Sequence, residues 1–148
     1  MLTIAEVKSI FSNQYALIDS FTTLDTRETD FLKLKRELLL LGLNYEAIIG
    51  GFSGHVSHTS LLEWPHPTIF AGDFRATMIR MGEMAQQQCI IVGEKNVVER
   101  IWFNGKPIEK GINQKGINPK LIELNNFSLI PCVSGTILIP EFAWKSKL

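Results

Sequence analysis

The sequence predicts an α+β fold, in which two N-terminal helices and one central helix pack on a mostly antiparallel sheet of five or six strands. Up to Gly42, apolar residues recur at helical spacing, whereas the chain that follows is divided into short apolar or alternating segments. Glycine, proline and asparagine separate these segments, as is typical of hairpins. The length of 148 residues predicts a single domain, residues 1–148, because a chain of this size buries about 70% of its unfolded surface.

The first helix is expected to begin at Thr3, which forms a capping box with Glu6. Residues 20–24 interrupt the helical pattern and are expected to end this helix. Its apolar stripe comprises Ile4, Val7, Phe11, Tyr15 and Ile18.

The second helix is expected to begin at Asp25, with Glu28 in the capping-box position. It should end at Gly42, since glycine tolerates the left-handed conformation. Because residues 38–41 are apolar nearly all round, we expect this end of the helix to be deeply buried. Its apolar stripe comprises Phe31, Leu34, Leu38 and Leu41.

Two strands and a third helix follow. Residues 45–52 and 56–64 predict strands joined by a turn at residues 53–55. The third helix is capped by Asp73 and extends to Gln88, where Gly82 predicts close packing. Its stripe comprises Phe74, Met78, Met81 and Ala85.

The C-terminal half predicts further antiparallel strands. Residues 89–92 and 97–103 indicate a hairpin, and the Asn-Gly pair at residues 104–105 indicates another turn. Residues 106–120 are polar and predict a long surface loop. Residues 121–130 and 136–139 predict two late strands.

The charge balance gives no bulk electrostatic support for a nucleic-acid or membrane partner. Fifteen basic and fifteen acidic side chains give a net charge of zero, so no bulk attraction to nucleic acid or an anionic membrane is expected. Residues 1–74 nevertheless carry a net charge of −4, and residues 75–148 carry +4. Opposite fields of this kind steer a partner, pair head to tail between molecules, or neutralise each other within one domain.

The cellular location is expected to be cytoplasmic, without a membrane partner. The N-terminus has no basic segment followed by an apolar one, and no apolar run approaches the roughly 18 residues of a membrane span. Two cysteines, Cys89 and Cys132, are too few for a disulfide-rich scaffold. We expect both to be small buried hydrophobic residues.

The histidines His55, His58 and His66 lie close together in the sequence. On a strand, His58 and His66 share a side that His55 does not, and no acidic motif completes a ligand set, so no metal is expected. Residues 50–54 lack the lysine of a phosphate-binding loop, and no glycine-x-serine-x-glycine pattern marks a nucleophile. We expect neither catalytic residues nor a cofactor.

Two sets of residues are candidates for binding. A small-molecule or nucleotide pocket, with or without hydrolysis of its ligand, would be lined by His55, His58, Ser60 and Gln88. Single-stranded nucleic acid would be bound by lysines in the polar loop together with nearby aromatic residues. That second set comprises Lys106, Lys110, Lys115, Lys120 and Trp144, with Trp102 and Phe103 just upstream of the loop. Trp144 is expected either to dock on the domain or to mark an interface.

Residues 34–105 resemble a family of small bacterial and phage-borne proteins, the domain-of-unknown-function family 3293. The resemblance rests on the order of residues 41–43, 48–51, 60–63, 88–93 and 104–105. This sequence has His58 where the family pattern has an acidic residue two positions before the serine, here Ser60. The resemblance implies a fold and no activity.

We therefore expect a small non-catalytic binding or regulatory protein that acts through protein–protein contacts, such as an accessory protein of a phage or mobile element. Binding of single-stranded nucleic acid and binding of a small molecule stay open as alternative hypotheses. Self-association through an exposed strand or through the C-terminal aromatic residues, Phe142 and Trp144, also stays open.

Overall fold

The computed structural model describes residues 2–19, 27–42, 44–52, 55–63, 74–112, 117–118, 127–140 and 142–145. Of these, the side chains of residues 19, 27–31, 44, 50–52, 55–63, 117–118 and 127 are not described. The elements are α1 (Ile4–Ser12), β1 (Gln14–Asp19), α2 (Arg27–Leu40), β2 (Asn44–Phe52), β3 (His55–Glu63), α3 (Phe74–Met84), β4 (Cys89–Glu94), β5 (Val97–Trp102), β6 (Glu109–Ile112), β7 (Ile117–Asn118), β8 (Phe127–Pro131), β9 (Ile137–Pro140) and β10 (Ala143–Trp144).

The described strands form one continuous antiparallel ladder in the order β10-β6-β5-β4-β1-β3-β2-β8-β9-β7. This confirms the predicted α+β class with helices on an antiparallel sheet, although the sheet has more than the expected five or six strands. Strand β1 lies in the middle, paired with β3 on one side and β4 on the other.

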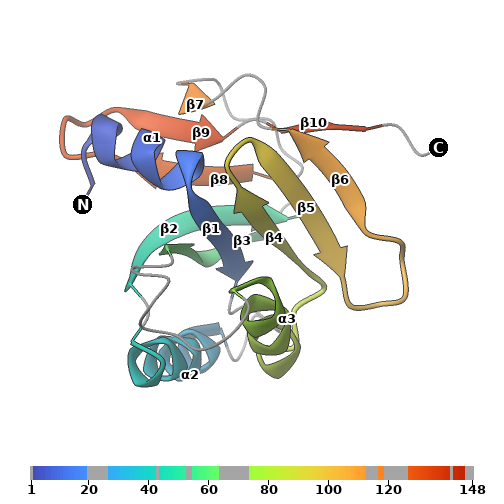
Figure 1. Ribbon diagram of the computed structural model, residues 1–148. Coiled ribbons are helices and arrows are strands. Elements are labelled where there is room, and N and C mark those ends of the chain that lie inside the picture. Colours follow the sequence, from blue (N-terminus) through green and yellow to red (C-terminus); the bar gives the residue numbers. More distant parts are fainter. Residues whose placement is uncertain are drawn as a thin grey trace.

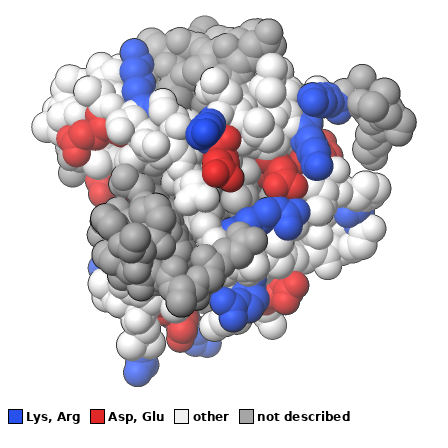
Figure 2. Space-filling model, in the orientation of Figure 1, with Lys and Arg blue, Asp and Glu red and all other residues white. Residues whose placement is uncertain are grey.

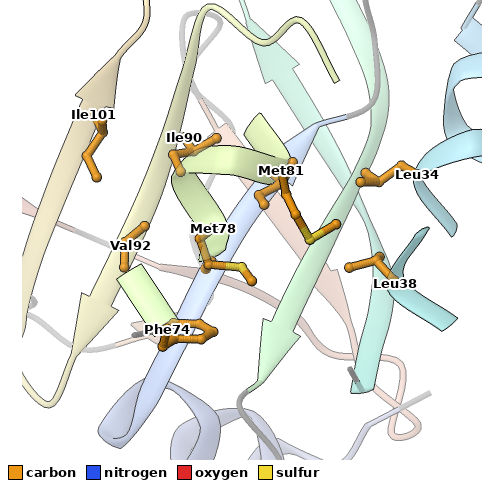
Figure 3. Close-up of a cluster of buried hydrophobic side chains, with 10 residues drawn as sticks. Leu34, Leu38, Phe74, Met78, Met81, Ile90, Val92 and Ile101 are labelled. Atoms are coloured by element: carbon orange, nitrogen blue, oxygen red, sulfur yellow. The ribbon is translucent and has the colours of Figure 1, made fainter. Parts of the chain in front are cut away.

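Two apolar layers lie on opposite faces of this sheet (Figure 1). Helices α2 and α3 cover one face, and Figure 3 shows Leu34 and Leu38 of α2 beside Met81 of α3 over the strands. On the other face, α1 packs with β8 and β9 (Figure 1), and Ile10, Ile130 and Leu138 are part of one buried cluster.

The prediction that the first helix includes Tyr15 and Ile18 is wrong. Helix α1 begins with the expected capping box, in which Thr3 and Glu6 exchange two hydrogen bonds of 3.1 Å, but it ends at Ser12. Residues 15–18 belong to β1, and all four side chains are buried. A continuous buried run is typical of a strand covered on both faces, and its apolar residues also happened to fit helical spacing.

The second helix ends as predicted, with Gly42 at φ +69°. The expected burial of residues 38–41 is wrong, however, because only Leu38 is buried. A helix packed on a sheet presents only one side to it, so a continuous run of leucines cannot all be covered by the same layer.

The predicted hairpins are confirmed for β2–β3 and β4–β5. Close packing at Gly82 is also confirmed, since a Cβ there would lie 2.6 Å from Cζ of Phe103 and 2.8 Å from Cγ2 of Ile90. The helix containing Gly82 ends at Met84, short of the expected Gln88. The predicted caps Asp25 and Asp73 lie outside the described residues.

The polar segment 106–120 is not simply a surface loop. Residues 109–112 form β6, which pairs with β5 and with β10, and residues 117–118 form β7. Strand pairing satisfies the backbone of β6 although most of its side chains are polar or glycine. Late strands occur as predicted, at β8 and β9, while residues 121–126 lie outside the described part of the chain.

Candidate functional site

Three leucines of α2 face solvent. Leu32, Leu39 and Leu40 have exposed fractions of 63%, 64% and 73%, whereas Leu34 and Leu38 of the same helix are buried. At roughly 100° of rotation per residue, the exposed leucines fall within about 100° of the helix circumference, opposite the two buried ones. A single exposed leucine is ordinary on a protein surface, but several on one helix face are typical of a contact surface.

Three cations accompany these leucines. Lys33, Lys35 and Arg36 are all exposed. By rotation along the helix, Arg36 lies between Leu32 and Leu40, and the two lysines lie on either flank. Among the described side chains, none is ion-paired with these three cations. We define the α2 outer face as Leu32, Lys33, Lys35, Arg36, Leu39 and Leu40.

Sequence reasoning missed the α2 outer face, although the signal was present. The predicted stripe assigned Leu38 and Leu41 to the core and treated Leu39 and Leu40 as part of the same buried end. Leucines that fall off the apolar stripe of an amphipathic helix, next to lysine and arginine, are the pattern that marks such a face.

Three of the four candidate ligand-binding residues lie on one strand, and the fourth lies two strands away. The backbones of His55, His58 and Ser60 lie on β3, where His58 pairs with Ile49 and Ser60 with Ala47; their side chains lie outside the described set, as does the whole of His66. Gln88 directly precedes β4, and β1 lies between β3 and β4. Two strand spacings separate Ser60 from Gln88 by about 10 Å or more along the sheet.

Some of the predicted aromatic and basic residues, namely Trp102, Lys106 and Trp144, lie at the β5–β6–β10 end of the sheet. Trp144 docks on the domain, because β10 pairs with β6 and Cζ of Arg100 lies 4.3 Å from the Trp144 ring centroid. Nζ of Lys106 lies 4.6 Å from the ring centroid of Trp102. Both rings therefore already have a cation against them.

An acidic residue lies at the centre of this cluster. Oε1 of Glu109 accepts hydrogen bonds from Nε1 of Trp102 at 2.8 Å and from Nη1 of Arg100 at 3.4 Å. Sequence reasoning did not single out Arg100 or Glu109, since only the register of β5 against β6 places them opposite each other. A carboxylate here repels phosphate, which favours a structural role for the cluster.

The other predicted lysines add little to this cluster. Lys110 is exposed on β6, at the position paired with Glu99. Lys115 and Lys120 lie outside the described residues. Over the described part of the face in Figure 2, lysine and arginine are interspersed with acidic side chains. Interspersed charge is typical of a solvated surface and does not resemble a phosphate-tracking groove.

A depression of about 540 Å³ lies between the start of α3 and the β4–β5 hairpin. Arg75 and Glu99, which line it, form a two-point ion pair, with Nε–Oε1 at 2.9 Å and Nη2–Oε2 at 3.1 Å. A charged ligand could bind Arg75 or Glu99 only by displacing this pair.

No protein-family model, curated protein or solved structure matches this chain. The resemblance of residues 34–105 to the uncharacterised family therefore stays a prediction. Within the described residues, no cluster of three metal-ligating side chains is found. None of the described helices is both long enough and apolar enough to cross a bilayer.

Proposed function

We propose that this protein is a non-catalytic binding protein that acts through protein–protein contacts, and that the α2 outer face is its contact surface. The observation that carries the proposal is the exposure of Leu32, Leu39 and Leu40 together on one side of α2. Burying a leucine side chain against a partner contributes about 1.5–3 kcal/mol, so these three leucines supply the apolar centre of a specific interface.

The surrounding polar groups support a protein partner over a small ligand. Lys33, Lys35 and Arg36 have long side chains around an apolar centre, which is the usual arrangement of a polar rim. The face belongs to a convex helix and not to a cleft, and small molecules bind in concave sites.

The proposal is tested by purifying the protein gently from its own host and weighing the intact complexes by native mass spectrometry. The wild type should carry a discrete protein partner, whereas the double variant Leu39→Gln/Leu40→Gln should lose it. Glutamine keeps nearly the helix propensity of leucine, so the melting temperature should stay within about 2 °C of wild type.

The matched control is Val133→Gln, because Val133 is also exposed, at 59%, but lies in the β8–β9 connection. This variant should keep the partner. Retention of the partner by the double variant would exclude the α2 outer face as the contact surface. Loss of the partner by both variants would show that the loss is not specific to this face, which would also contradict the proposal.

A further inference from the structure

We infer that the occupant of the α2 outer face is an acidic amphipathic helix of a partner protein. This inference rests on the proposed function and specifies the chemistry of the partner. Three properties of the face carry it: its backbone, the spacing of its leucines and its charge.

Because the backbone groups of α2 are hydrogen-bonded within the helix, α2 favours a partner that is also helical. Inside a helix, N–H and C=O groups bond to each other, so the middle of α2 offers no backbone hydrogen bonds to a second chain. An extended peptide lying on it would bury its own N–H and C=O groups without partners. A helix satisfies its own backbone and needs only side-chain contacts.

The spacing of the leucines fits the packing of one helix against another. Leu32, Arg36 and Leu40 form a row with a spacing of four residues, and Leu39 lies beside that row. Rows of this spacing are the ridges that enter the grooves of a neighbouring helix. The row extends over about 12 Å, which corresponds to roughly two turns of a partner helix.

The charge of the face selects an acidic partner. Lys33 and Lys35 flank the leucines and Arg36 lies between them, and among the described residues no carboxylate forms an ion pair with these three cations. Glutamate or aspartate on the flanks of a partner helix would pair with these cations and steer its approach. A second copy of the same face would instead bring two sets of cations together, which disfavours a symmetric dimer through α2.

The probe is a synthetic peptide of about 18 residues with leucine at the first and fourth heptad positions and glutamate on both flanks. The control peptide has lysine in place of every glutamate. Fluorescence anisotropy should show that the wild type binds the acidic peptide at least about tenfold more tightly than the basic one. The double variant Leu39→Gln/Leu40→Gln should bind the acidic peptide at least about tenfold more weakly than the wild type does.

A charge exchange provides the decisive variant. Arg36→Glu should lower the affinity for the acidic peptide and raise the affinity for the basic peptide, because a carboxylate at this position repels glutamate and attracts lysine. Val133→Gln should change neither affinity. Equal binding of both peptides, or no effect of Arg36→Glu, would overturn the inference.

Two other occupants give distinct results. Cosedimentation with vesicles of phosphatidylserine and phosphatidylcholine, lost in Leu39→Gln/Leu40→Gln, would make this face a lipid-binding surface and overturn the inference. A dimer in analytical ultracentrifugation that this double variant dissociates would assign the face to a second copy, with the same consequence.

The two proposals fail separately. If the double variant loses its native partner but the wild type does not bind the acidic peptide, the result supports the α2 outer face as the contact surface. The same result contradicts the inference that the partner is an acidic helix. If neither the native partner nor the acidic peptide depends on Leu39 and Leu40, both proposals fall.

Discussion

The indole of Trp102 and the carboxylate of Glu109 are joined across the β5–β6 hairpin by a hydrogen bond of 2.8 Å from Nε1 to Oε1. Arg100 donates to the same oxygen, and its side chain is only 18% exposed. One carboxylate therefore accepts hydrogen bonds from two partly buried donors, and both of these hydrogen bonds would be lost without it.

Replacing this carboxylate should destabilise the domain. Glu109→Ala removes the acceptor for Trp102 and the counter-charge for Arg100, so we expect the free energy of unfolding to fall by about 1–3 kcal/mol. Urea denaturation measures this change. Glu109→Gln keeps an acceptor oxygen without the charge, so its free energy of unfolding should lie between those of Glu109→Ala and the wild type. An unchanged urea midpoint for Glu109→Ala would contradict the structural role.

Tyr15→Phe should not cost stability. The Tyr15 hydroxyl is buried, and among the described residues it has no hydrogen-bond partner. Its ring lies against Gly93, where any side chain would overlap it. Because an unpaired buried hydroxyl is unfavourable, we expect Tyr15→Phe to raise the free energy of unfolding by up to about 1 kcal/mol. A loss of stability in urea denaturation would reveal a hydrogen-bond partner.

The same residue predicts a dependence on alkaline pH. Burial raises the pKa of Tyr15 well above its ordinary value of 10.0. Above pH 10 the unfolded chain releases this proton while the folded protein retains it, so the contribution of Tyr15 to stability falls as the pH rises. The free energy of unfolding of the wild type, relative to that of Tyr15→Phe, should therefore decrease between pH 9 and 11. The slope of this decrease should be at most about 1.4 kcal/mol per pH unit. Tyr45→Phe is the matched control.

Gly82→Ala should be destabilising although alanine favours helices. The helical preference is worth about 1 kcal/mol, but the new methyl group would lie 2.6 Å from Phe103 and 2.8 Å from Ile90. Since overpacking costs about 1–3 kcal/mol, we expect a net loss of up to about 2 kcal/mol in urea denaturation. Glu83→Ala, at an exposed position of the same helix, should be neutral. A more stable Gly82→Ala variant would show that Phe103 moves aside readily.

Trp144→Ala distinguishes a structural role from base stacking. Loss of the contact between Arg100 and Trp144 should lower the free energy of unfolding by about 1–2 kcal/mol and leave binding of single-stranded oligonucleotides unchanged. Unchanged stability together with a loss of salt-sensitive oligonucleotide affinity would restore the nucleic-acid alternative.

Local signals in the sequence predicted much of the fold. The capping box of Thr3 and Glu6 and the β4–β5 hairpin depend on residues close together in the chain, so their patterns were readable. Strand β1 was missed because Tyr15 and Ile18 fit the helical period, and only tertiary burial on both faces distinguishes the two structures.

The candidate site was less accessible to prediction. Docking of Trp144 and pairing of Arg100 with Glu109 require the order and register of β5, β6 and β10, which are long-range properties. The exposure of Leu39 and Leu40 depends on which side of α2 meets the sheet. That choice follows from Leu34 and Leu38 but was obscured by the continuous leucine run.

Each end of the described strand order is a strand of only two residues, β10 at one side and β7 at the other. Such short terminal strands present few unpaired backbone groups on which another chain could add by main-chain pairing. Growth of the sheet from molecule to molecule, the route to fibrils, is thereby discouraged at these two ends of the described strand order.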